Sequence, residues 1–586
     1  MTCRFQSAEE AIALVDEDSA RAHLVSNYSK WQVTARADSS GSFSAADVGT
    51  LDRLHQRGAH LSLEGLSLLG APIGTDAFVA ARVTAAFSKS LALIQRASDA
   101  LTFARSGAGA EGAPTVHPGL QFIRMCLCAL PNYTLRTVPP ALLGDNPERF
   151  DSAITACLLR LLHHPRDGFH HLTAEVNALL LASPVSDGVG HVAQVRRLAG
   201  LRCGAALPAA TLAVSPAYLG SIALVAPVIE DVACCVTGAA PDEVMEHIRR
   251  QCAPYELPFQ VYFQARGDSS RRRGASRSHS RLARGGSTLP AYQPSESREK
   301  LQRRLTGVAR QARIQQILSY SPPRPLDVNR CASNLASSMS VDSGAWMFAN
   351  TRQAFLTFPD DVARLAIFRR LQLLPPAPDR CGSCSQPLAD LDIFTHAVSC
   401  THRLANRTAG ALVEKAVFNV VSLLEPGATR TPVLSAHPLH NAASTAGKLE
   451  GDVRSHHCGR DVILDVTVTS RAQVGASPWQ DCRRAADMAA AEKVREYGGP
   501  VDGLLPSHAF VPVAVDAMGT WGTAFARYMA EAKAYATRQG RLDVPDALSR
   551  ARVTVSRAAA EANVHYFRAA YGRRGVLPPF PCSPGI

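Results

Sequence analysis

The sequence predicts a multidomain protein with a mainly helical first half, a cysteine–histidine knuckle and a C-terminal α/β domain. Its 586 residues are too many for one hydrophobic core. Apolar residues recur at helical spacing in the first 260 residues, as in AARVTAAFSKSLALIQRASDAL (80–101) and FDSAITACLLRLLHH (150–164). From residue 405 to 575 helical and strand patterns alternate, which is typical of an α/β fold.

Composition indicates a globular protein with an anionic partner. Hydrophobic residues make up 46% of the chain and charged residues 19%, with a net charge of +12. Nucleic acid is favoured over a membrane surface, because the sequence has no obvious basic amphipathic helix and no apolar run that approaches the length of a membrane span. The fifteen cysteines are odd in number and scattered, which favours a reducing compartment over a disulfide framework. The opening MTCRFQSAEEAIALVDED lacks a signal-peptide pattern, so we expect an intracellular protein.

An arginine- and serine-rich linker is expected at residues 261–290. The stretch ARGDSSRRRGASRSHSRLARGGS carries seven arginines and one acid, and such a composition cannot bury a core. It is typical of a solvated tether, a non-specific nucleic-acid contact or a nuclear localisation signal, and these interpretations are compatible. The candidate phosphate contacts are Arg271, Arg272, Arg273 and Arg277.

A helical connector (291–375) leads to a cysteine–histidine cluster within residues 376–404. In CGSCSQPLADLDIFTHAVSC the spacing is C-x2-C-x11-H-x3-C. Three thiolates and one imidazole form a closed tetrahedral shell for structural Zn²⁺. The alternative is a buried or degenerate cluster that binds no ion. The candidate ligands are Cys381, Cys384, His396 and Cys400.

The α/β domain is expected to contain, in order, a helix, two strands, a helix, a strand and a helix. The helices are AGALVEKAVFNVVSLL (409–424), AADMAAAEKVREY (485–497) and FARYMAEAKAYATRQG (525–540), and the late strand lies in HAFVPVAVDAMG (508–519). Between them, LEGDVRSHHCGRDVILDVTVTS (449–470) predicts two strands around a polar turn. A period of two places its valines and Leu464 on one face and Asp461, Asp465 and Thr467 on the other.

Several segments together resemble the C-terminal part of the reverse-transcriptase polyprotein of non-LTR retrotransposons that carry a restriction-enzyme-like endonuclease. DIFTHAVSC is similar to that family's zinc motif, and SGAWM (343–347) precedes it as in relatives. FVPVAVDAMGTWG (510–522) resembles the strand and glycine turn that close the nuclease. The matches before residue 340 are looser: NYSKWQVTA (27–35) resembles a palm segment, LLGAPIG (68–74) a primer grip, and LPNYTLRTVPP (130–140) with residues 150–164 the thumb and connection helices.

The resemblance implies a polymerase palm end and thumb/connection remnant at residues 1–260 and a restriction-endonuclease-like domain at 405–575. The polymerase signature, an aromatic residue followed by paired aspartates, does not occur in this sequence. The chain begins with residues that resemble the segment immediately downstream of that signature. We therefore expect polymerase activity to be lost through N-terminal truncation, since the carboxylates that hold two metal ions are missing. Lys30, which resembles the palm lysine, is then expected to be a surface residue.

Asp452 and Asp465 are the candidate catalytic carboxylates. Their twelve-residue separation matches the family's P-D-x(12–14)-D/E pattern, although Gly451 replaces the usual proline. The resemblance implies that these two acids lie on adjacent strands and share a Mg²⁺ or Mn²⁺ ion. The resemblance places the catalytic lysine and a tyrosine on the next helix as K-x3-Y, here Lys493 and Tyr497.

Other interpretations of these residues stay open. Lys448 is a competing candidate for the catalytic lysine. Glu450 is either an auxiliary metal ligand or an exposed strand-end acid, and Arg407 is either a phosphate contact or a surface arginine. The aspartates could instead bond neighbouring main chain or one of three nearby arginines, namely Arg454, Arg460 and Arg471.

The resulting prediction is a retrotransposon-derived, metal-dependent DNA endonuclease that nicks a target site in the nucleus. Its expected partners are target DNA, retrotransposon RNA and a full-length reverse transcriptase that supplies the polymerase. The alternative is an inactive nucleic-acid-binding remnant, in which the linker, thumb and knuckle bind by charge and shape.

Overall fold

The protein is described here by a computed structural model. It describes residues 60–61, 64–68, 70–106, 116–162, 205–221, 337–338, 340–349, 357–371, 373, 380–388, 396–398, 400, 403–430, 452–457, 460–469, 482–496, 508–541 and 546–571, with scattered positions between 13 and 58 and between 305 and 314. The chain forms two compact units. The first comprises residues 1–94, 127–153 and 208–314, and the second comprises 95–126, 154–207 and 315–586.

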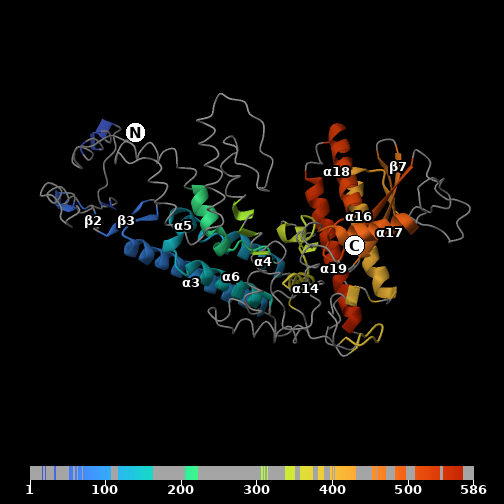
Figure 1. Cartoon of the computed structure of the whole chain (residues 1–586), viewed down its shortest axis with the longest axis horizontal. Coiled ribbons are helices and arrows are strands. Elements are labelled where there is room, and N and C mark those ends of the chain that lie inside the picture. Colours follow the sequence, from blue (N-terminus) through green and yellow to red (C-terminus); the bar gives the residue numbers. More distant parts are fainter. Residues whose placement is uncertain are drawn as a thin grey trace, which may run out of the picture. The chain divides into compact units, whose positions relative to one another are not determined.

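The first unit contains small strand pairs and helical segments (Figure 1). Strands β1 (Gln32–Val33) and β2 (His60–Leu61) are parallel. Strands β3 (Gly65–Leu68) and β4 (Ala71–Gly74) form an antiparallel hairpin that turns through Gly70, whose φ of 88° suits a residue without Cβ. The first unit also contains the first part of α3 (Asp76–Ser106), α5 (Asn132–Thr137), η3 (Pro140–Leu142), the beginning of α6 (Asn146–Leu162) and helical residues 210–221.

Helix α3 corrects one expectation from the sequence. Its stretch Asp76–Leu101 is long and apolar enough, by length and composition alone, to cross a membrane. The buried side chains Val79, Val83, Phe87 and Ile94 recur at helical spacing. Core helices of water-soluble proteins pass the same test, so this one helix does not by itself indicate a membrane segment.

The second unit is built around a four-stranded sheet with the order β5-β6-β7-β8. Strand β5 (Thr429–Arg430) pairs with β6 (Val453–His457), β6 forms an antiparallel hairpin with β7 (Arg460–Thr469), and β8 (His508–Asp516) runs parallel to β7. Helix α17 (Arg484–Glu496) lies between β7 and β8 in the sequence, because parallel neighbours require a crossover.

Helices cover both faces of this sheet. We call the face that carries Arg454, His456, Asp461, Ile463 and Asp465 the acidic face, since Arg454 pairs with Ile463 and His456 with Asp461. Helix α17 packs on this face through an alanine cluster, Ala486, Ala489, Ala490 and Ala514.

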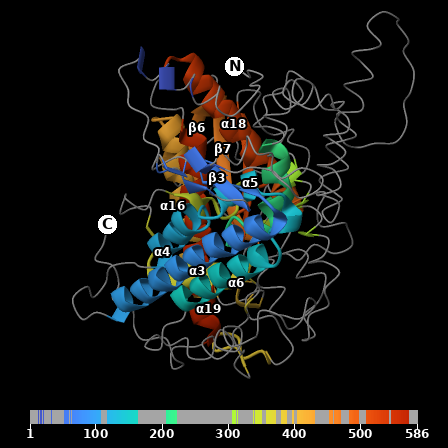
Figure 2. The ribbon, with the colours of Figure 1, turned by 90° about the vertical axis from the view of Figure 1, so that its left-hand side faces the viewer.

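The opposite face carries Val453, Val462 and Leu464, all of them buried. On this face the buried Ser455 of β6 donates to Glu425, which follows α16 (Arg403–Leu424), and accepts from Tyr528 of α18 (Thr523–Arg538). Figures 1 and 2 show α16, α18 and the strands gathered together. The valines and the acids therefore lie on opposite faces, as the alternation predicts.

Helix α19 (Ala547–Tyr571) connects several parts of the second unit. Its Ser556 hydroxyl accepts the Trp346 N–H of η5 (Ala345–Phe348), and Arg369 of α14 (Asp360–Arg370) donates to its Asn563. Asn563 in turn donates to the carbonyl of Ala517, in the turn after β8. The SGAWM segment is thereby bonded to the same helix as the glycine turn of the α/β region.

The expected architecture is confirmed at a coarse level. The described chain is mainly helical with small sheets, its helices and strands occur where the sequence places them between 403 and 540, and a Cys/His cluster is present. Strand β5 and helix α19 were not predicted from the sequence. The five-segment domain division stays a prediction.

Candidate functional site

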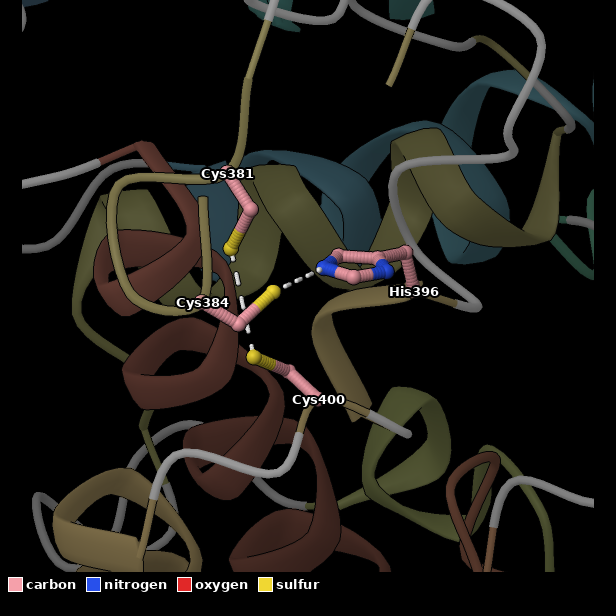
Figure 3. Close-up of side chains that lie close together, drawn as sticks. All are labelled: Cys381, Cys384, His396 and Cys400. Carbon is pink, nitrogen blue, oxygen red and sulfur yellow. Dashed lines mark hydrogen bonds between the residues drawn. The ribbon is translucent and has the colours of Figure 1, made fainter. Parts of the chain in front are cut away.

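The predicted zinc ligands converge on one point. Figure 3 shows the side chains of Cys381, Cys384, His396 and Cys400 turned toward one another, and their ligand atoms all lie within 4.8 Å of each other. Cys381 Sγ is 3.9 Å from Cys400 Sγ, and Cys384 Sγ is 3.4 Å from His396 Nε2. Around a tetrahedral zinc ion, S–S and S–N edges measure about 3.8 and 3.6 Å. The four residues thus lie close enough to bind one metal ion, and the geometry is compatible with structural zinc.

The backbone of residues 381–386 positions the two cysteines of the C-x2-C half of this cluster. Cys381 N–H donates to Gln386 O over 2.9 Å, and Ser385 N–H donates to Cys381 O over 2.8 Å. Ser385 adopts a positive φ of 59°, which closes the turn. The Ser383 N–H points at Cys381 Sγ from 3.4 Å, an arrangement that stabilises a thiolate.

Ionisation in the cluster suits metal binding. Burial opposes ionisation of Cys384, but hydrogen bonds from the Gln386 main chain and from the Cys400 and Cys381 thiols outweigh it, so the pKa of this thiol is lowered. Burial lowers the pKa of His396 and so favours the neutral imidazole that can coordinate a cation.

The knuckle also completes the C-terminal end of α19. Gly382 N–H donates to Ala570 O over 2.6 Å, and the Ser383 hydroxyl donates to Ala569 O. The last carbonyls of a helix have no partner within the helix, so these two bonds satisfy groups that would otherwise need water. The cluster therefore supports the fold beyond its own residues.

The two candidate carboxylates lie beside one another. Asp465 is buried in the middle of β7. Asp452 directly precedes β6; its N–H donates to Leu464 O over 3.0 Å, and its Oδ2 accepts the Val466 N–H over 2.6 Å. Asp452 thus contacts the main chain on both sides of Asp465. Its bond to Val466 matches the alternative that the sequence left open, in which an aspartate bonds neighbouring main chain.

Lys493 reaches the same place from α17. Its Nζ lies 3.1 Å from Asp465 Oδ2. The carboxylate is 7% exposed and the lysine 24% exposed, so the ion pair is shielded on the aspartate side. The fold therefore brings together three residues that are far apart in the sequence.

Acidic groups outnumber basic ones around Asp452, since two carboxylates and one lysine affect its pKa. Burial raises the pKa of Asp452 to about 6, the Val466 hydrogen bond opposes the shift, and the charges of Asp465 and Glu414 add to it while Lys493 reduces it. Glu414 is a residue that sequence reasoning missed. It lies on α16 and is ion-paired with Arg430 of β5, Glu414 Oε1 being 2.7 Å from Arg430 Nε.

Several predicted site residues lie outside the described part of the chain. They are Lys448, Glu450, Tyr497 and the linker arginines Arg271, Arg272, Arg273 and Arg277. Arg407 falls within α16, but its side chain is also outside the described part. Their proposed roles stay predictions.

The chain matches no protein-family model, and no curated protein matches it. The chemistry of the two sites therefore rests on their own geometry. Three sulfurs and one imidazole form a closed shell that leaves no position for a substrate. The acidic pair differs, because two carboxylates beside a lysine can hold a divalent cation and a phosphate together.

Proposed function

We propose that the α/β region, residues 405–575, is a metal-dependent DNA endonuclease of restriction-enzyme type. The observation that supports it most is the meeting of Asp452, Asp465 and Lys493, since Lys493 Nζ lies 3.1 Å from Asp465 Oδ2 and Asp452 bonds the residue after Asp465. The resemblance of the sequence names these same residues as a nuclease site.

In this proposal each residue has a defined task. Asp452 and Asp465 would hold Mg²⁺ or Mn²⁺; when bound, such an ion supplies an acidified water and neutralises charge on the phosphate. Lys493 would place a positive charge beside the phosphate oxygens, which carry the negative charge of the pentacoordinate transition state. Water adds to phosphorus and the P–O3′ bond breaks, which leaves a 3′-hydroxyl and a 5′-phosphate. In a retrotransposon, such a 3′-hydroxyl would prime copying of its RNA.

The second part of the proposal is that Cys381, Cys384, His396 and Cys400 hold a structural Zn²⁺. Its contribution is to stability, because the knuckle that it closes satisfies the end carbonyls of α19. The proposal therefore assigns different ions to different tasks, zinc to the fold and magnesium or manganese to hydrolysis.

Nicking of supercoiled plasmid with Mg²⁺ or Mn²⁺ tests the nuclease. We expect the wild-type chain to convert the plasmid to open circles, and Asp452→Asn and Asp465→Asn each to slow the reaction by about 100-fold or more, since each removes a metal ligand. Asp546→Asn, at the exposed residue before α19, is the matched control and should nick normally. Equal circular dichroism spectra would show that all four chains are folded.

An inactive nucleic-acid-binding protein is the competing function, and the arginine-rich stretch at 265–287 favours it. The same experiment separates the two. DNA binding that is unaffected by Asp465→Asn, without nicking by the wild-type chain in either metal, would support the binding protein and reject the nuclease.

A further inference from the structure

The acidic face of the β6–β7 hairpin also carries an exposed arginine, Arg454, next to Asp452 and Asp465. Arg454 of β6 pairs in register with Ile463, which is two residues from Asp465 on the same face. A two-residue step along a strand covers about 6.6 Å. Arg454 therefore lies one such step from Asp452 along β6. Its side chain is 44% exposed and extends toward Asp461, on the side of Ile463 away from Asp465.

A hydrogen-bonded triad holds Arg454 in this position. Its Nη2 donates to Asp461 Oδ2 across the hairpin. The other carboxylate oxygen, Asp461 Oδ1, lies 3.0 Å from His456 Nδ1. Both contacts lower the pKa of Asp461 to about 2, the His456 hydrogen bond most strongly, so this aspartate is charged at neutral pH.

The ion pair with Asp461 uses one nitrogen of the Arg454 guanidinium. A guanidinium carries five N–H donors in a planar fork that matches the oxygens of a phosphate. An arginine whose orientation is fixed by a neighbouring carboxylate loses less conformational freedom when it binds. The side chain is thus both oriented and exposed, and it lies on the face at which the acids meet.

We propose that Arg454 binds the phosphodiester backbone of DNA next to the phosphate that is cut, and that Asp461 and His456 position it. The proposal rests on the proposed nuclease for the place at which the DNA enters. It adds a specific substrate contact to that site. The phosphate bound by Arg454 flanks the phosphate placed between Asp452, Asp465 and Lys493.

The salt dependence of DNA binding tests this contact independently of catalysis. The probe is a short duplex of mixed sequence, bound in the presence of Mg²⁺ by the whole chain with Asp465→Asn, which we expect to bind without cutting. Each phosphate contact contributes about 0.9 to the slope of log K against log salt. We expect Arg454→Gln in the Asp465→Asn chain to reduce the magnitude of the slope by about 0.9. The ratio between the affinities of the chains with and without Arg454 should then shrink roughly threefold between 50 and 200 mM salt.

Two variants serve as controls. Arg538→Gln removes the same charge from an exposed position in the last turn of α18 and should leave the slope unchanged. Arg454→Lys retains a cation without the planar fork and should retain the slope while it weakens binding.

The outcomes separate this inference from the proposed function. A slope for Arg454→Gln equal to that for Arg538→Gln would overturn the contact, even if the wild-type chain nicks plasmid. A reduced slope together with a wild-type chain that does not nick would reject the nuclease and keep Arg454 as a DNA contact.

Discussion

At the scale of single residues, Asp452 is held in place by two hydrogen bonds to the main chain of β7, one from its N–H and one to its carboxylate. One of its oxygens accepts the Val466 N–H, and burial raises the pKa of the group to about 6. A carboxylate that ionises less readily in the folded protein opposes folding once it is charged. Asp452 is therefore retained at a cost in stability, which is common at functional sites.

The pH dependence of stability tests this cost. The folded-state pKa of Asp452, about 6, lies above its ordinary value of 3.8, so the penalty develops as pH rises from about 4 to 6. In metal-free buffer, Asp452→Asn should raise the free energy of unfolding by roughly 1–2 kcal/mol at pH 8 and by less at pH 4.5, after allowance for solvent screening. Denaturant unfolding at both pH values measures it. An equal effect at both pH values, or a loss of stability at pH 8, would contradict the raised pKa of Asp452.

An ion cluster around a buried carboxylate is the second feature at this scale. Asp342 is fully buried; its Oδ2 lies 2.7 Å from Arg483 Nη2, and its Oδ1 lies 3.0 Å from Arg552 Nε. Arg483 also donates to Trp521 O and immediately precedes α17, the helix that carries Lys493. Asp342 thus connects the segment before the knuckle to the proposed active site.

Removal of the Asp342 charge should destabilise the protein. Asp342→Asn leaves two arginines without their shared carboxylate, and we expect a loss of about 3 kcal/mol in denaturant unfolding. The exposed pair between Glu492 and Arg495, at 4.0 Å, provides the comparison. Glu492→Gln should change stability by less than about 0.5 kcal/mol, and similar effects for both variants would refute the buried cluster.

At the scale of elements, the sequence predicts the features that depend on local pattern. Alternation in β7 separates the valines from Asp465, and the helices that flank β8 have clear apolar periodicity. Helix α19 was not predicted, because β-branched residues such as Val553 and Val555 interrupt its helical signal. Both side chains are buried in the fold, so tertiary packing outweighs local propensity. Glu414 was missed for a related reason, since only the packing of α16 brings it near Asp452.

The bond between the knuckle and α19 gives a prediction at this scale. Removal of the proposed zinc ion by a chelator should speed amide hydrogen exchange in the last turn of α19, because the groups that bond Ala569 and Ala570 lose their fixed positions. Ser383→Ala removes one of these bonds and should cost about 1 kcal/mol with zinc still bound. Unchanged exchange at Ala569 and Ala570 after complete removal of the metal would show that the knuckle does not support this helix.

At the scale of the whole molecule, the net charge of +12 favours non-specific binding of nucleic acid, and the arginine tract is its densest source. Replacement of Arg271, Arg272, Arg273 and Arg277 by serine should lower the salt slope of DNA binding by up to about 3.6, at 0.9 per lost phosphate contact. Nicking at saturating DNA should keep its rate, because these residues lie outside the proposed nuclease region. An unchanged salt slope would show that the arginine-rich tract does not contact DNA and serves only as a linker.

The proposed nuclease depends on a catalytic metal ion held by Asp465 on β7 and Asp452 before β6. The most direct measurement is Mg²⁺-dependent nicking of supercoiled plasmid by the wild-type chain and by Asp465→Asn. We expect open circles from the wild-type chain only, with nicks that end in 3′-hydroxyls that a polymerase can extend. No metal-dependent nicking by a folded wild-type chain, or equal nicking by Asp465→Asn, would contradict it.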